Sequence, residues 1–197
     1  MPTIDTQTWI MIAGVVLLLI ALAALIIYKK KQSHRLHERF GKEYDRSVDD
    51  LGSRSKAEAE LKAREERVEK LNILPLAPAE ADRFSHTWKE LQGRFVDNPK
   101  NAVAQADQLV RELMLKRGYP IGDFERRAAD ISVDHPEVVA HYRAAQAIAV
   151  RDKRGEADTE ELRKAVVHYR ALFDELLEIK EDRQQAMPAI TNEEGRS

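Results

Sequence analysis

Residues Trp9–Tyr28 read WIMIAGVVLLLIALAALIIY, and none of them is charged. At about 1.5 Å of rise per residue, a helix of this length matches the roughly 30 Å hydrocarbon core of a bilayer. Trp9 and Tyr28 stand at its two ends, where aromatic residues lie at the membrane interfaces. The run therefore predicts a single membrane-spanning helix.

The charges on either side of this run predict its orientation. Lys29, Lys30 and Lys31 follow it directly, whereas residues 1–8 contain no Lys or Arg. Because basic residues beside a span stay in the cytoplasm, we expect the N-terminus outside and the rest of the chain inside. The lysines also attract anionic lipid, by about 1 kcal/mol each. Together with Trp9 and Tyr28 they form the predicted anchor, whose partner is the lipid bilayer.

The overall composition excludes several classes of function. The chain has 32 Lys and Arg against 34 Asp and Glu, interspersed beyond the lysine cluster. A nucleic-acid partner is not expected, because binding it requires a basic surface. The absence of Cys excludes disulfide scaffolds and thiolate metal sites.

Apolar residues at helical spacing continue beyond the span. A helical stripe is predicted from Ser33 to Leu51, formed by Leu36, Phe40, Tyr44, Val48 and Leu51. A second helix, from Ser55 to about Asn72, has few large apolar residues and predicts a solvated stalk or a weak coiled coil. Pro75 and Pro78 then mark the entry to a compact domain.

The compact domain is predicted to be an antiparallel bundle of about four to five helices with short loops. No strand-like alternation is present, so the predicted fold is all-α: one transmembrane helix, a charged helical stalk and a bundle. The expected divisions are residues 1–8 as a short extracytoplasmic N-terminus, 9–28 as the span, 29–78 as a basic juxtamembrane segment and stalk, 79–180 as the bundle, and 181–197 as a disordered tail.

The most unusual local feature is a near repeat, VVAHYRA at residues 138–144 and AVVHYRA at residues 165–171. If the two helices form an antiparallel hairpin, both tyrosines face the core and a His and an Arg flank each one. One interpretation is a groove that binds an anionic ligand or a partner, lined by His141, Arg143, His168 and Arg170. The other, which we favour, is two similar helices with buried tyrosines and solvated flanks.

Other chemistry finds little support in the residues. Glu137 and His141 have the spacing of metal ligands, but nothing supplies a third ligand at matching spacing. No glycine-rich phosphate loop is present, so we expect no enzyme activity, no cofactor and no metal. The loop from Arg117 to Arg127 predicts either a recognition surface or a tight corner in which Tyr119 and Phe124 plug the core.

Three segments carry a resemblance to a family: Arg39–Arg46 (RFGKEYDR), Arg117–Asp123 (RGYPIGD) and Val133–Pro136 (VDHP). With the single span, they resemble a group of uncharacterised bacterial single-pass membrane-anchored helical proteins, over most of residues 36–178. The resemblance implies the cytoplasmic membrane of a bacterium and no mechanism.

The sequence thus predicts a non-enzymatic interaction or scaffold module that holds a protein partner, or a second copy of itself, at the inner face of that membrane. The alternative is a membrane-tethered ligand-binding sensor or a small enzyme that uses the His/Arg groove. A concave, polar pocket reached by the four side chains would favour the alternative. A filled core with an exposed apolar patch would favour the interaction module.

Overall fold

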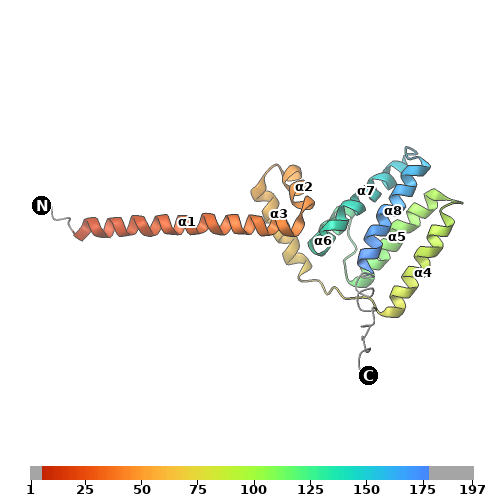
Figure 1. Ribbon diagram of the computed structural model, residues 1–197, viewed down its shortest axis with the longest axis horizontal. Coiled ribbons are helices and arrows are strands. Elements are labelled where there is room, and N and C mark those ends of the chain that lie inside the picture. Colours follow the sequence, from red (N-terminus) through yellow and green to blue (C-terminus); the bar gives the residue numbers. More distant parts are fainter. Residues whose placement is uncertain (1–5, 178–197) are drawn as a thin grey trace, which may run out of the picture. The chain divides into compact units, whose positions relative to one another are not determined.

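The computed structural model describes the backbone of residues 6–177 and the side chains of residues 14–177. Over this range every regular element is a helix, so the prediction of an all-α fold with a helical bundle is confirmed (Figure 1). The helices are α1 (Thr6–Phe40), α2 (Lys42–Leu51), α3 (Arg54–Val68), α4 (Pro78–Arg94), α5 (Pro99–Arg117), α6 (Phe124–Asp134), α7 (Pro136–Lys153) and α8 (Thr159–Leu176). Their contacts divide the chain into two units, one up to Leu61 and one from Lys62 onward.

In the first unit, the chain bends at Gly41 between α1 and α2. Gly41 has a φ of 49°, a backbone conformation that suits glycine. Phe40 and Tyr44 are buried on either side of the bend, but Val48 is only half-buried and Leu51 is exposed. The predicted unbroken stripe from Ser33 to Leu51 is therefore wrong. After the bend, α2 turns a different face inward, and this face includes Glu43 and Ser47.

Helix α3 closes this unit with one apolar face. Ala57 and Leu61 are fully buried, so this part of the predicted stalk is packed and not solvated all round. The Tyr44 hydroxyl donates a hydrogen bond of 2.8 Å to Oε1 of Glu58 and lies 3.2 Å from the Ser33 hydroxyl. This polar contact ties α2 to α3 and to the end of α1.

The predicted membrane span lies partly outside the described side chains. Trp9 belongs to α1, but side chains are described only from Gly14 onward, and residues 1–5 lie outside the described backbone. Among the residues that the structure describes, no helix is both long and apolar enough to cross a membrane.

In the second unit, α4 packs on α5, α5 on α8, α8 on α7, and α7 on α6 (Figure 1). Side-chain hydrogen bonds cap the N-terminal ends of α5 and α8. The Asn98 side chain accepts a hydrogen bond of 3.1 Å from the Asn101 N–H, and Asp158 and Glu161 form a reciprocal capping box. Helix α8 ends at Leu176, and residues 178–180 of the predicted bundle lie outside the described range, as does the predicted tail 181–197.

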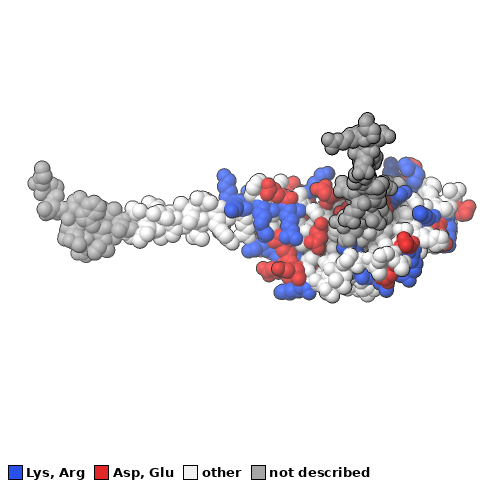
Figure 2. All heavy atoms as spheres, turned by 60° about the horizontal axis from the view of Figure 1, so that its bottom comes forward, with Lys and Arg blue, Asp and Glu red and all other residues white. Residues whose placement is uncertain are grey.

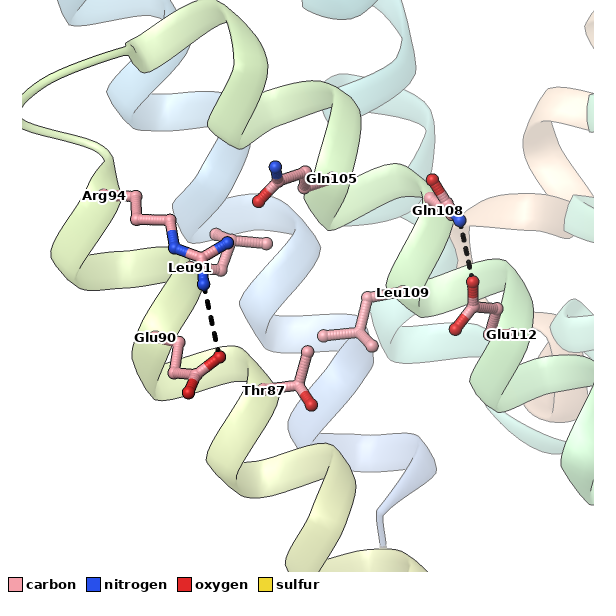
Figure 3. Close-up of a pocket in the computed structure, with 8 residues that line it drawn as sticks. All are labelled: Thr87, Glu90, Leu91, Arg94, Gln105, Gln108, Leu109 and Glu112. Atoms are coloured by element: carbon pink, nitrogen blue, oxygen red, sulfur yellow. Dashed lines mark hydrogen bonds and ion pairs between the residues drawn. The ribbon is translucent and has the colours of Figure 1, made fainter.

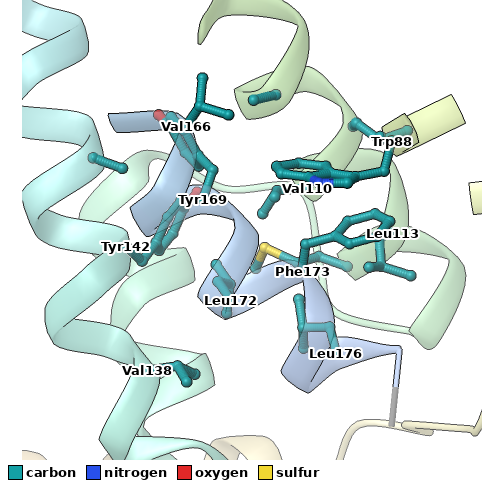
Figure 4. Packing of buried hydrophobic residues seen from close by; sticks show 14 of the residues in the cluster. Trp88, Val110, Leu113, Val138, Tyr142, Val166, Tyr169, Leu172, Phe173 and Leu176 are labelled. Atoms are coloured by element: carbon teal, nitrogen blue, oxygen red, sulfur yellow. The ribbon is translucent and has the colours of Figure 1, made fainter. Parts of the chain in front are cut away.

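The core of the second unit is continuous and rich in aromatic residues (Figure 4). Trp88 of α4 stacks on Phe173 of α8 with 4.6 Å between ring centres. Tyr142 and Tyr169 lie farther along the same core, and both are fully buried. Stacked and edge-on aromatic pairs of this kind add stability beyond the area they bury.

Residues 62–78, placed by the sequence analysis in the stalk, pack along the second unit. Leu71, Ile73 and Leu76 are partly buried against its core. Arg67 donates a hydrogen bond of 2.8 Å to Asp130 of α6, whose side chain is only 1% exposed. This segment therefore shares the core of the bundle that follows it.

The corner after α5 fits the segment 62–78 closely. Gly118 ends α5 with a φ of 99°, a left-handed helix cap of the kind that glycine favours. The Leu74 N–H donates a hydrogen bond of 2.9 Å to the Arg117 carbonyl. Tyr119 is buried and Phe124 packs on Tyr142 at 4.8 Å between ring centres. These contacts favour the corner interpretation of this loop over the recognition surface.

Gly118 allows a test of this close fit. A Cβ at Gly118 would lie 2.3 Å from the Asn72 carbonyl oxygen, whereas a Cβ at Gly155 would meet nothing within 4 Å, although Gly155 also has a positive φ of 74°. We expect Gly155→Ala to cost about 1 kcal/mol, the usual cost of a left-handed alanine. Gly118→Ala should cost about 2–4 kcal/mol, because overpacking is added. Urea denaturation of the two variants measures this difference, and equal costs would contradict the proposed contact.

Candidate functional site

The near repeat lies on the α7–α8 hairpin, which has the largest helix-to-helix contact in the second unit. Tyr142 and Tyr169 both face the core and meet edge-on, with 6.3 Å between ring centres (Figure 4). The predicted inward direction of both rings is confirmed.

The two tyrosine hydroxyls are satisfied by residues of neighbouring helices. The Tyr142 hydroxyl accepts a hydrogen bond of 3.0 Å from Arg127 of α6. The Tyr169 hydroxyl donates one of 3.2 Å to Asp107 of α5, and Asp107 in turn pairs with Arg111 at 3.2 Å. Each side chain thus links the hairpin to another helix.

The surroundings of the tyrosines disfavour ionisation. Burial raises the pKa of Tyr142, although the Arg127 hydrogen bond opposes this shift. Burial raises the pKa of Tyr169 far above its ordinary value, and the negative charge of Asp107 adds to the effect. Both rings therefore remain neutral phenols near neutral pH, and neither is poised to act as a base or a nucleophile.

The two histidines of the repeat contact each other across the hairpin. Their Nδ1 atoms are 2.9 Å apart, so one ring must carry the Nδ1 proton while the other accepts it. Burial lowers the pKa of His168, and the neighbouring His141 lowers it further. The arrangement therefore favours a pair in which at least one imidazole is neutral.

The two arginines of the repeat are held elsewhere. Arg143 forms an ion pair of 2.6 Å with Glu125 of α6, and its guanidinium lies 5.9 Å from the centre of the Phe124 ring. Arg170 pairs at 3.3 Å with Asp174, one turn along its own helix. Of the four predicted groove residues, the structure therefore brings the two histidines into contact. The two arginines do not join them, because each pairs with a different carboxylate.

A groove that the sequence analysis missed lies between α4 and α5 (Figure 3). Its volume is about 230 Å³, and its polar lining is formed by Thr87, Glu90, Arg94, Gln105, Gln108 and Glu112. Arg94 pairs with Glu90, and Gln108 donates a hydrogen bond of 2.8 Å to Glu112. In the sequence these residues resemble ordinary solvated helix faces, and nothing in their spacing points to a shared groove.

The histidine pair has no third potential metal ligand beside it in the described part of the chain. Within residues 14–177, no group of three or more His, Cys, Asp or Glu side chains is placed to hold a metal ion.

The chain was compared with models of known protein families, with curated proteins and with solved structures, and none of them matches it.

The lowered pKa of His168 predicts how stability depends on pH. Because the folded-state pKa lies below the ordinary value of about 6.5, the unfolded chain takes up this proton first as the pH falls. Stability should therefore decrease as the pH falls from about 7.5 to about 5. Denaturation of the His168→Gln variant should show a weaker dependence over this range.

The matched control is His86→Gln, which removes an exposed histidine paired with Glu90 on α4. This variant should keep the dependence of the parent protein. A His168→Gln variant with the full pH dependence of the parent would contradict the prediction.

Proposed function

We propose that this protein is a single-pass, membrane-anchored interaction module without enzyme activity. Its helical bundle would hold a protein partner, or a second copy of the chain, at the cytoplasmic face of a bacterial membrane. The bacterial setting rests on the family resemblance. The orientation rests on the three lysines that follow the apolar run.

The observation that carries the proposal is the exposed apolar surface of α1. Large side chains between Val15 and Tyr28 are exposed all around the helix, from 47% at Val16 to 69% at Leu18. Residues 14–28 of α1, which precede the three lysines, contain no charged residue (Figure 2). A continuous apolar surface of this kind is unfavourable in water. A lipid bilayer is an environment that suits a helix apolar on every side.

The bundle supports an interaction role over catalysis. The buried tyrosines are kept neutral and are already hydrogen-bonded inside the core. Arg143 and Arg170 are both occupied by carboxylates. Groups that bind and release a substrate direct hydrogen-bond donors and acceptors at a common point, whereas each of these four side chains has a partner within the bundle and the partners lie apart.

The anchor is tested by placing charge in the apolar run. Replacing both Leu18 and Ile20 with Asp should move the protein from the membrane fraction to the supernatant, because a charged residue at the centre of a span costs about 3 kcal/mol. Val167→Asp is the matched control, since Val167 is also exposed, at 54%, but lies on α8. A double variant that stays with the membrane would refute the anchor.

The orientation has its own test. A reporter that is active only in the cytoplasm should be active when fused after Ser197, and one that requires export should be silent. The opposite pattern would reverse the proposed topology.

The alternative function is a ligand-binding sensor or small enzyme that uses His141, Arg143, His168 and Arg170. The observation that favours it is the contact between the two histidines, whose Nδ1 atoms are 2.9 Å apart across the hairpin. Replacing all four residues with Ala tests this alternative by complementation of a deletion strain. We expect the variant to fold and to complement. A folded variant that fails to complement would make the sensor or enzyme the leading function.

A further inference from the structure

The histidine pair has the geometry of a chelate. His141 and His168 are separated by 27 residues and come from different helices, yet their Nδ1 atoms are 2.9 Å apart. Two nitrogens bound about 2.05 Å from one metal ion lie about 2.9 Å apart when the angle between them is about 90°. At the tetrahedral angle the separation is about 3.3 Å. Both rings must turn from the present hydrogen-bonded arrangement so that the two nitrogens point at one ion.

The core beneath the two histidines holds the backbone on which they stand. Each histidine directly precedes a fully buried tyrosine, Tyr142 or Tyr169. The two helices therefore cannot separate without removing both aromatic rings from the core. A metal ion would find its two ligands already placed, so binding would not have to order the backbone.

Neutral imidazole is a ligand that copper, nickel and zinc ions all accept. The ligand must be deprotonated to bind. His141 is exposed and His168 is half-buried, so water can complete the coordination of a bound ion.

We propose that His141 and His168 form a two-histidine site that binds a divalent transition metal of the copper, nickel and zinc class and so clamps α7 to α8. This site uses the two histidines of the predicted His/Arg groove, and neither arginine takes part. It is also independent of the proposed membrane anchor.

The test uses the full chain in detergent micelles at about pH 7.5, purified through a tag without histidine and treated with a chelator. Titration with Ni²⁺ should raise the melting temperature until it saturates, by about 5 °C or more at about 100 times the dissociation constant. Mg²⁺ should have no such effect, because it prefers oxygen ligands. No rise with Ni²⁺ would overturn the proposal.

Variants identify the ligands. His141→Ala and His168→Ala should each abolish the rise, while His86→Ala should keep it, since His86 is an exposed histidine elsewhere on the bundle. A rise that persists in either hairpin variant, or that His86→Ala removes, would place the metal elsewhere. Circular dichroism of the metal-free variants checks that each is folded.

A spectroscopic measurement covers the case in which a hairpin variant does not fold. Electron paramagnetic resonance of the parent protein with one equivalent of Cu²⁺ should show coupling to two imidazole nitrogens. The variant His168→Gln offers a second, milder removal of one ligand and should reduce this coupling to one nitrogen. Coupling to a different number of nitrogens in the parent would overturn the proposed site.

Discussion

The burial of two tyrosine hydroxyls constrains the whole bundle. A hydroxyl taken out of water without a partner costs about 1–3 kcal/mol, so each must meet a polar group inside the fold. Tyr169 finds Asp107 on α5, and Tyr142 finds Arg127 on α6. The partners lie on different helices, and sliding α5 or α6 along the hairpin by one turn would break a bond. The two hydroxyls thus fix the register of the helices as well as their contact.

Much of the second unit could be predicted from the sequence because its signals are local. Asn98 followed by Pro99, Asp158 with Glu161, and Gly118 after a basic turn each act within a few residues of a helix end. The inward direction of the tyrosines follows from their place in an apolar repeat, since a helix puts residues of that spacing on one face.

The contacts between distant residues could not be predicted in this way. The bend at Gly41 turns a different face of α2 inward, although the spacing of apolar residues continues unchanged through it. The partner of Arg143 is Glu125, on a helix whose position depends on the packing of the whole unit. The contact between His141 and His168 depends on how far α7 and α8 are shifted along each other. The repeat alone does not determine this shift, because a displacement by one turn in either direction would fit it equally well.

The attachment of residues 62–78 has a mechanical consequence. Arg67 is tied to Asp130, Leu74 is tied to Arg117, and Asn72 lies over Gly118. In all three contacts, one partner belongs to the segment that precedes α4 and the other lies after α4 in the chain. A force applied to the chain on its N-terminal side would act on these three contacts together, at the corner between α5 and α6. Only after they had broken would the force reach α4. Tension in the chain would therefore be resisted by the partly buried Arg67–Asp130 ion pair, by the Leu74–Arg117 hydrogen bond and by the apolar side chains of residues 71–76, while the aromatic pairs stayed intact.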